Sequence, residues 1–306
     1  MGAFNSISQL VGKTPILELV NIEKKYGLDC KIFAKLEMLN PCGSAKDRVA
    51  LHILDVAERD GKIKAGGTII ESTSGNTGIG LAGIGTSRGY KVVIVMPDTM
   101  SRERIKTMEA YGATVVLSDG ALGMAGANEL AQKIAKETPN SFVAGQFENM
   151  ANPEAHYLTT GPEIYEDLDG EIDYFVCAVG TGGTISGVGK YLKEKCKNIK
   201  IVAVEPKNSP LLSGGVAGAH KIQGIGANFV PSTLDRKIYD EIITVSDEDA
   251  YKYTAEISQN EGVLAGISSG CVLCAALEIA KREKNKKIAV VFPDTGMRYL
   301  SNGVWG

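Results

Sequence analysis

Short apolar runs alternate with longer amphipathic stretches along most of the chain. The apolar runs have the length of strands: GTIIES (67–72), YKVVIVMP (90–97), ATVVLS (113–118), DYFVCAVG (173–180), IKIVAVEP (199–206) and KKIAVVFP (286–293). Between them lie helical patterns such as DRVALHILDVAERDG (47–61), SRERIKTMEAYG (101–112) and MAGANELAQKIAKE (124–137). Continuous apolar strands separated by helices predict an α/β fold whose mostly parallel sheets are covered by helices on both faces.

Polar residues mark where some of these helices begin. SRER and SDEDAYKY, which start at Ser101 and Ser246, place a hydroxyl at the expected first turn and acidic side chains just after it. Such residues cap free backbone N–H groups and interact favourably with the positive end of a helix. We therefore expect helices to begin at these two serines.

The size of the chain predicts two lobes. It has 306 residues, of which 44% are hydrophobic, enough for a large core that is split in two. The expected larger lobe, which binds the cofactor, comprises residues 1–39 and 151–306. The expected smaller lobe, which is mobile, comprises residues 40–150. Each lobe should contain a twisted, mostly parallel sheet flanked by helices.

Charge and cysteine content exclude several classes of function. The net charge is -3 and no basic run stands out, so neither nucleic acid nor an anionic membrane is an expected partner. No apolar stretch could cross a bilayer and no secretory pattern opens the chain, which predicts a cytoplasmic protein. Of the six cysteines, only Cys271 and Cys274 have paired spacing. A closed zinc site is therefore not expected, and we interpret this pair as the packed face of a helix.

The loops that follow strands are the places to look for a ligand, because α/β folds bind ligands outside the carboxyl ends of their strands. One such loop is GTGGT, Gly180–Thr184, between an apolar run and a helical pattern. Its glycines allow backbone N–H groups to point inward, and a helix start attracts an anion, so a phosphate is the natural ligand. A tight glycine turn without a ligand is the alternative.

A second loop, STSGNTG (72–78), is crowded with hydroxyl and amide groups. Gathered at a helix start, these donors suit a carboxylate or the ring oxygen of a cofactor. Ordinary helix capping would explain one or two of them.

The adjoining GIGLAG, Gly78–Gly83, also matches the G-x-G-x-x-G pattern of dinucleotide-binding proteins, and Asp98 follows the next strand. A nicotinamide-dependent dehydrogenase is therefore an alternative. However, the polar TSGNT already fills the strand-to-helix turn, so the glycines should lie inside the helix and permit close packing. A dehydrogenase would also leave Lys46 and GTGGT without a function.

Lys46 is the candidate nucleophile. It follows the strand-like KIFAKLEM (31–38) and the small residues Gly43, Ser44 and Ala45, and it opens a helical pattern. A lysine is nucleophilic only when its surroundings lower its pKa, and a solvated lysine is the ordinary alternative. Together with a phosphate loop and a carboxylate loop, however, it completes the set that binds pyridoxal phosphate as a Schiff base and presents an amino acid to it. A binding module without catalysis is the remaining alternative.

The sequence resembles the cysteine synthase (O-acetylserine sulfhydrylase) and cystathionine β-synthase family of fold-type II pyridoxal-phosphate enzymes. The resemblance runs from VGKTPILEL near residue 11 to GMRYLS at 296–301. It is carried by GSAKDR, ESTSGNTGIGLA, MPDTMSRER, GQFENMANPEAHYLTTGPEI, GTGGTISG, HKIQGIGANF and EGVLAGISSG. It implies a fold-type II architecture, pyridoxal 5'-phosphate as cofactor, an amino-acid substrate with a thiol or sulfide, and a homodimer that could bind serine acetyltransferase.

The resemblance also implies roles for individual residues. Lys46 would bond covalently to the cofactor and then transfer the proton at the substrate α-carbon. The cofactor-binding residues would be Lys46, Asn76, Gly180, Thr181, Gly182, Gly183, Thr184 and Ser268. The residues around the substrate would be Thr73, Ser74, Thr77, Gln146, Gly224 and Ile225. We also expect Asn228, where this sequence departs from the family pattern, to lie near the substrate. No residue is assigned to a metal.

Ser268 carries a chemical consequence of its own. A neutral hydroxyl beside the pyridine nitrogen cannot keep that nitrogen protonated, so the ring is a weaker electron sink than it would be beside a carboxylate. This favours prompt loss of a β-substituent, which gives an α-aminoacrylate that a thiol or sulfide attacks. Ser268 therefore favours β-replacement, although it could instead cap the next helix.

Direction and substrate stay open. The favoured reaction is O-acetyl-L-serine plus sulfide giving L-cysteine and acetate. The alternative uses L-cysteine and releases hydrogen sulfide, forming serine, lanthionine or cystathionine. Cys42 and Asn228 stand where relatives commonly carry small residues, and they could crowd the cleft or hydrogen-bond the second substrate. The shared motifs do not separate the two reactions.

Two further residues lie where a functional role is conceivable. His156 lies within a family-like stretch and is interpreted as structural, since the three histidines show no metal or triad spacing. Asp294 follows a strand and could approach the cofactor.

Overall fold

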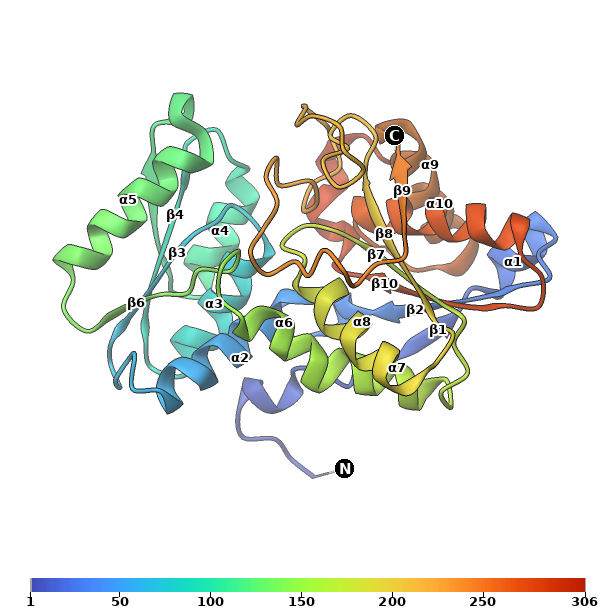
Figure 1. Ribbon diagram of the computed structural model, residues 1–306. Coiled ribbons are helices and arrows are strands. Elements are labelled where there is room, and N and C mark those ends of the chain that lie inside the picture. The colour runs from blue at the N-terminus through green and yellow to red at the C-terminus, as the bar shows by residue number, and fades with distance from the viewer. Residues whose placement is uncertain (1, 306) are drawn as a thin grey trace. The chain divides into compact units, whose positions relative to one another are not determined.

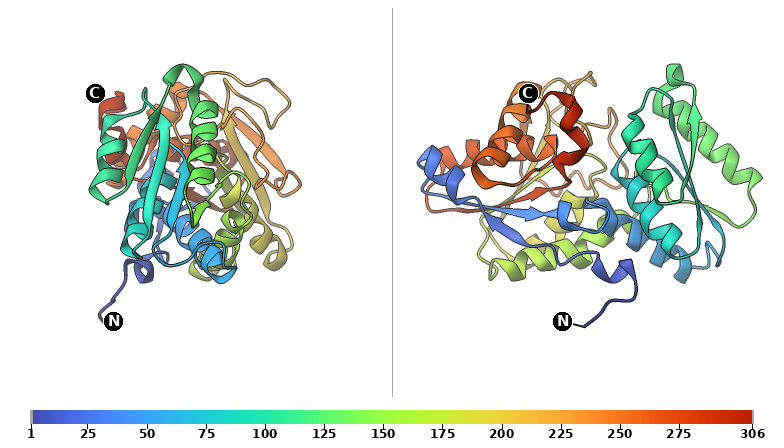
Figure 2. Two further views of the ribbon diagram at one scale, coloured as in Figure 1. Left: turned by 90° about the vertical axis from the view of Figure 1, so that its left-hand side faces the viewer. Right: turned by 180° about the vertical axis from the view of Figure 1, so that it is seen from behind.

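A computed structural model describes residues 2–305 and divides into two compact units. The first unit comprises the residues up to Val11 together with Asn40–Asn152, and the second comprises Gly12–Leu39 together with the residues from Pro153 onward. The N-terminal residues thus cluster with the first unit, whereas the sequence-based boundaries assigned 1–39 to the larger lobe. Figures 1 and 2 show the helices and strands of each unit.

The first unit is built on a four-stranded sheet with the order β5-β4-β3-β6, in which all neighbouring strands are parallel. Its strands are β3 (Thr68–Ser72), β4 (Lys91–Pro97), β5 (Thr114–Ser118) and β6 (Ser141–Val143). Its main helices are α2 (Lys46–Arg59), α3 (Asn76–Ser87), α4 (Arg102–Ala110) and α5 (Gly123–Glu137), with the short η1 (Ile7–Leu10) and η3 (Gly120–Leu122).

Helices cover both faces of this sheet. Ile69 and Ile94 point into a cluster with α2, α3 and Met108 of α4. Their sequence neighbours Ile70 and Val95 point to the opposite face, where they pack against α5. Because successive side chains of a strand alternate between faces, a strand buried on both sides needs a continuous apolar run, as the sequence has. Figure 1 shows α5 on one side of the strands and α3 and α4 on the other.

The second unit contains a six-stranded sheet with the order β1-β2-β10-β7-β8-β9. Only β1 is antiparallel to its neighbour, and the other pairs are parallel. The strands are β1 (Ile16–Glu18), β2 (Lys31–Leu36), β7 (Tyr174–Ala178), β8 (Lys200–Pro206), β9 (Glu241–Val245) and β10 (Lys287–Phe292). The predicted fold class, two mostly parallel sheets flanked by helices, is confirmed.

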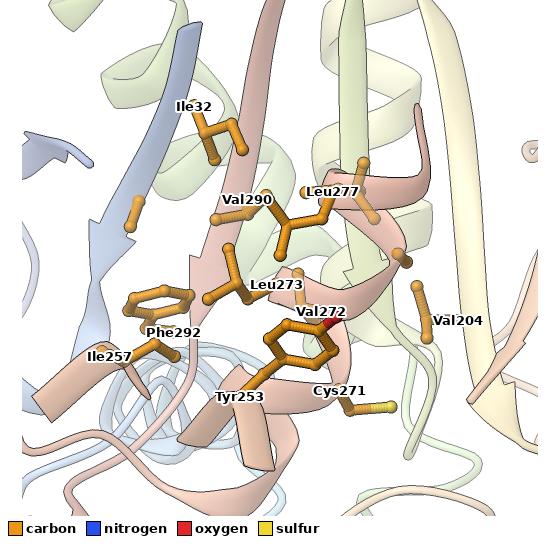
Figure 3. Close-up of a cluster of buried hydrophobic side chains, with 14 of the residues drawn as sticks. Ile32, Val204, Tyr253, Ile257, Cys271, Val272, Leu273, Leu277, Val290 and Phe292 are labelled. Atoms are coloured by element: carbon orange, nitrogen blue, oxygen red, sulfur yellow. The ribbon is translucent and has the colours of Figure 1, made fainter. Parts of the chain in front are cut away.

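Two sets of helices cover this second sheet. One set comprises α1 (Val20–Tyr26), α9 (Asp247–Glu261) and α10 (Ile267–Arg282), and the other comprises α7 (Gly161–Asp167) and α8 (Gly183–Lys195). The shorter elements are η2 (Glu37–Leu39), α6 (Ala151–Ala155), the π-helix η4 (His156–Thr160) and η5 (Gly296–Asn302). Figure 3 shows Cys271, Val272 and Leu273 of α10 packed with Tyr253 of α9 and Phe292 of β10.

The six apolar runs all form strands, and the cysteine pair lies on α10 as expected. Cys271 is fully buried, and burial raises the pKa of its thiol well above the usual value, which opposes redox chemistry there. Helices begin directly after both serines, as predicted, since Ser101 is the N-cap residue of α4 and Ser246 that of α9, but only one of them caps its helix with its side chain. Ser246 accepts a hydrogen bond from the backbone N–H of Asp249, as a cap should. Ser101 makes no such bond and donates instead to the Glu103 carboxylate at 2.8 Å.

Two observations on residues 2–305 concern membrane spans and metal sites. No helix in this range has the length and hydropathy needed to cross a membrane. Within the same residues, no group of three or more His, Cys, Asp or Glu side chains could hold a metal ion.

Candidate active site

The loop after β3 holds its polar groups in defined positions. Helix α3 begins at Asn76, and Gly75, the residue before it, has no side chain that could cap the helix. Thr73 is buried, and its hydroxyl accepts the N–H of Gly75 at 3.2 Å. The carbonyl oxygen of Ser74 accepts a hydrogen bond from Arg104 of α4 at 3.1 Å. The N-cap position of α3 thus has no capping side chain, and Thr73 bonds to the backbone within the loop instead.

The glycines of α3 bring this helix close to Lys46, the first residue of α2. A Cβ atom at Gly80 would lie 3.1 Å from the carbonyl oxygen of Lys46, and one at Gly83 would lie 2.5 Å from Sγ of Cys42. Gly78 likewise faces Met108 at 2.9 Å. The G-x-G-x-x-G pattern thus lies inside a helix and serves close packing, which removes the main support for a dinucleotide site.

A buried carboxylate shapes the turn that precedes Lys46. Asp47 is fully buried and accepts the backbone N–H of Cys42 at 2.6 Å and the hydroxyl of Ser44 at 3.3 Å. The Ser44 hydroxyl also accepts the backbone N–H of Lys46 at 3.2 Å. Cys42 itself is buried, with 4% of its surface exposed, so it packs against α3. These bonds fix the backbone of Lys46, whose side chain is partly exposed.

Gln146 lies in the loop after β6, next to the loop after β3. It is 5% exposed, and its side-chain oxygen accepts a short hydrogen bond from the Thr77 hydroxyl. The carboxylate of Glu71, which precedes the polar loop, accepts the backbone N–H of Gly145 at 2.7 Å and that of Gln146 at 3.4 Å. Sequence reasoning named Thr77 and Gln146, and the structure brings them together. It missed Glu71, which read as an ordinary strand residue.

In the second unit, β7 leads through Gly180–Thr184 into α8. Gly182 has φ +81° and precedes the helix, and a Cβ there would lie 2.5 Å from Cβ of Leu234. Both the backbone conformation and the space thus require glycine. Thr181 is buried, and its carbonyl oxygen accepts the Thr233 hydroxyl at 2.6 Å. The result is a helix start that has no capping side chain and is held in place by its packing, which is the kind of helix start that binds phosphate.

The loop around Gly224 packs directly on this helix start. A Cβ at Gly180 would lie 2.3 Å from the carbonyl oxygen of Gly224 and 3.7 Å from Cα of Ile225. The N–H of Gly226 donates to the carbonyl oxygen of Val179 at 3.0 Å. The structure therefore joins two predicted groups, the phosphate loop and the loop of Gly224 and Ile225.

Thr184 has a neighbour that sequence reasoning treated as structural. Its hydroxyl lies 3.1 Å from Nε2 of His156, and Nδ1 of His156 lies 2.8 Å from the hydroxyl of Thr160. His156 is fully buried at the start of the π-helix η4. Gly187 of α8 allows this close approach, since a Cβ there would lie 2.8 Å from Cβ of His156. No sequence signal links Thr184 to a residue 28 positions earlier.

Ser268 lies in the first turn of α10 and is 3% exposed. It is not the N-cap, which is Gly266, so the capping alternative does not hold. The N–H of Gly266 donates to the carbonyl oxygen of Asp294 at 2.9 Å, just after β10. Because β10 and β7 are parallel neighbours, Ser268 and the loop after β7 lie at the same edge of the sheet. The Asp294 carboxylate accepts the Tyr299 hydroxyl at 2.6 Å.

Asn228 takes the place of a small residue by adopting a conformation that glycine favours. Its φ is +61°, and asparagine tolerates this left-handed region better than most residues. Its side-chain oxygen accepts the Ser209 hydroxyl at 2.9 Å. This bond pins the loop and occupies one polar atom that was expected to face a substrate.

These residues fit pyridoxal phosphate. The second unit offers a glycine-lined helix start for a phosphate and a buried serine hydroxyl for a ring nitrogen. The first unit offers an amine at the start of α2 and an amide at the start of α3, and the two helices pack closely at Gly80. Each donor has the chemistry that one part of the cofactor needs.

Known proteins are similar to this chain in sequence and in fold. The sequence pattern of the family described as pyridoxal-phosphate dependent enzyme matches residues 7–294. The chain is 50% identical over 303 residues to a cysteine synthase of Staphylococcus aureus strain Mu50. The matched region covers 98% of this chain and 97% of that protein. The chain therefore belongs to the family of pyridoxal-phosphate dependent enzymes.

Solved structures of this family resemble the fold. One is a cysteine synthase of Entamoeba histolytica, with a TM-score of 0.96 and 44% identity over 99% of this chain and 91% of that one. Another is a hydrogen sulfide-producing enzyme of Fusobacterium nucleatum, with a TM-score of 0.93 and 47% identity over 97% of this chain and 100% of that one.

Proposed function

We propose that this enzyme is a cysteine synthase, which replaces the acetate of O-acetyl-L-serine by sulfide to give L-cysteine. The observation that carries the proposal is 50% identity, over nearly the whole of both chains, to a cysteine synthase. The local geometry supports it, because the polar groups required for an amino acid and for the cofactor are built into rigid helix starts.

Pyridoxal phosphate, when bound, withdraws electrons from the substrate α-carbon so that a group on the β-carbon can leave. We assign its phosphate to the helix start at Gly180–Thr184, where the backbone N–H groups and the positive end of α8 favour an anion. Asn76 would hydrogen-bond the ring oxygen, and Ser268 would face the ring nitrogen. As a neutral hydroxyl, Ser268 keeps the electron withdrawal moderate and so favours β-replacement over other reactions of the α-carbon.

Lys46 would hold the cofactor and carry the proton of the substrate α-carbon. A lysine can alternate between these tasks only if its backbone stays in place while its side chain moves. The hydrogen bond from its N–H to Ser44 and the contact of its carbonyl with Gly80 provide that support. The side chain is partly exposed, which leaves it room to move.

The loop after β3 would bind the substrate carboxylate. Thr73, Ser74, Thr77 and Gln146 are the residues we assign to it. Bonds to Arg104 and Gln146 hold this loop in one conformation, so little entropy is lost when the substrate binds. We place Gly224, Ile225 and Asn228 at the entrance for the second substrate.

A second candidate is release of hydrogen sulfide from L-cysteine. It is favoured by the 47% identity to the hydrogen sulfide-producing enzyme of Fusobacterium nucleatum. Both reactions use the same groups around the α-carbon, and they differ in the leaving group that the β-carbon pocket accepts.

Two assays on one purified sample separate the candidates. We expect rapid formation of cysteine from O-acetylserine and sulfide, and slow release of sulfide from L-cysteine alone. Faster release than synthesis at matched substrate concentrations would favour the second candidate. Lys46→Ala should lower either activity by about three orders of magnitude or more and remove the visible absorption of the lysine-bound cofactor. Lys62→Ala is the matched control, since Lys62 is an exposed lysine of the same unit.

We also propose that the enzyme is a homodimer in the cytoplasm and that it binds serine acetyltransferase. These proposals come from the family resemblance. Light scattering on the purified protein tests the dimer, and co-purification with added serine acetyltransferase tests the complex.

A further inference from the structure

Glu71 is a buried acid next to the proposed carboxylate site. It is the fourth residue of β3, is 3% exposed and lies two residues before Thr73. Its carboxylate accepts the N–H groups of Gly145 at 2.7 Å and Gln146 at 3.4 Å, which lie in the loop after β6. The bonds cross from one strand end to another, 74 and 75 residues apart in the sequence.

The surroundings of Glu71 make this carboxylate an unusual structural support. Burial raises its pKa to about 7, while bonds from the backbone of Gly145 and Gln146 and from the Gln146 side chain lower it. A buried charge costs free energy, and joining two strand ends does not by itself require a charged group. Stability alone therefore does not explain why an acid occupies this position.

Gln146 connects Glu71 to the loop that we assign to the substrate. Its backbone N–H is held by Glu71, its backbone oxygen accepts the side-chain amide of Asn152 at 2.8 Å, and its side-chain oxygen accepts the Thr77 hydroxyl. Each of these bonds restricts the orientation of the side-chain amide of Gln146. Glu71, Gln146 and Thr77 thus form one hydrogen-bonded chain from the interior to the start of α3.

We propose that Glu71 is a positioning residue for the amino-acid substrate: its carboxylate fixes Gln146, and through it Thr77, in the orientation that binds the substrate carboxylate. The role rests on the proposed function, because it requires that Gln146 and Thr77 bind that group. A glutamine at position 71 can accept one N–H bond but presents a second N–H where an acceptor is needed, so it leaves Gln146 partly released.

Steady-state kinetics of Glu71→Gln test this role. We expect KM for O-acetylserine to rise about tenfold, the effect of one lost charge-assisted hydrogen bond, while kcat changes less than about threefold. KM for sulfide should stay constant, since sulfide has no carboxylate. Glu71→Asp keeps the charge, so its KM for O-acetylserine should fall between that of the wild type and that of Glu71→Gln. Glu58→Gln is the matched control, since Glu58 is an exposed acid of α2 that bonds to Arg88 and Tyr90.

Amide hydrogen exchange gives a second readout that does not depend on turnover. In the holoenzyme without substrate, Glu71→Gln should speed exchange at Gly145 and Gln146 about tenfold, with the β4–β5 amides unchanged. Unchanged exchange and unchanged KM would overturn the proposal, as would a fall in kcat at constant KM. If the wild-type enzyme does not use O-acetylserine, the function assigned above fails. The same KM comparison is then made with L-cysteine, whose carboxylate is identical, and decides the role of Glu71.

Discussion

The two units hold the residues that we assign to the cofactor and the substrate by different means. The first unit offers mainly side chains: an amine, an amide and several hydroxyls, each held by hydrogen bonds to neighbouring loops. The second offers mainly backbone, in a helix start where Gly180 and Gly182 leave no room for a side chain. A side-chain site can change its chemistry by substitution while its fold persists. A site made of backbone N–H groups can change only if the backbone itself is distorted. Substitutions there should therefore lower both the stability of the fold and the affinity for the cofactor.

The largest effect on stability is expected at Gly182. Gly182→Ala would force a Cβ to within 2.5 Å of Leu234 in a left-handed conformation, at a cost of about 4 kcal/mol in the free energy of unfolding. Affinity for the cofactor should fall at least about tenfold as the helix start shifts. Urea denaturation and cofactor titration measure the two losses.

Gly214→Ala is the matched control for that experiment. Gly214 belongs to the same unit and has φ +90°, but nothing lies within 4 Å of its Cβ position. It should lose only about 1 kcal/mol from backbone strain and keep its affinity for the cofactor. Equal losses in both variants would mean that strain alone, and not the packing of the helix start, accounts for the effect.

An intermediate effect is expected from the charge of Glu71. Its folded-state pKa of about 7 lies above its ordinary value of 4.5. Its contribution to stability is therefore present in full below pH 4.5 and is lost as the pH rises through 7. The loss is on the order of 3 kcal/mol.

Glu71→Gln should remove this dependence. The free energy of unfolding, measured by urea denaturation at pH 5 and pH 8 in samples with equal cofactor content, should fall more steeply in the wild type than in the variant. Parallel slopes would mean that ionising this buried acid costs little. The stability of the first unit would then depend even less on the side chain at position 71 than the comparison of the two units suggests.

The smallest effect is expected at Asn228. Asn228→Gly keeps the left-handed conformation and loses only the bond to Ser209, so stability should change by less than about 1 kcal/mol. KM for sulfide should change less than about threefold if the side chain only pins its loop. A larger change would show that the amide contacts the second substrate, and that side chains also matter in the second unit.

Much of the fold could be predicted because its strands are buried on both faces. Runs such as YKVVIVMP have no plausible place except the middle of a covered sheet, and they form β4 and its neighbours as expected. The short strands β1, β6 and β9 were not predicted, since three to five residues of mixed polarity give little periodic signal. The bonding of Ser101 could not be predicted from sequence either, because its hydroxyl can bond to a backbone N–H or to the nearby Glu103 carboxylate.

Candidate site residues could be named from sequence where the polar groups lie within one loop. The loops of Thr73, Thr77 and GTGGT stood out because each combines glycine with hydroxyl groups at an expected helix start, and the family resemblance supplied the role of each residue. Glu71 was not named, and His156 was interpreted as structural, since their partners lie far away in the sequence and become neighbours only in the folded chain. Asp47 was likewise visible only as a charge near Lys46, although it orders the whole preceding turn.

The contact between Gly80 and the carbonyl of Lys46 has one more consequence. It brings α2 and α3 close together near Lys46 and Asn76, the first residues of the two helices, to which we assign the cofactor. In Gly80→Ala the added methyl group would lie 3.1 Å from the carbonyl oxygen of Lys46, so the two helices would have to move apart. We therefore expect this variant to bind the cofactor more weakly, although the side chains of Lys46 and Asn76 are unchanged.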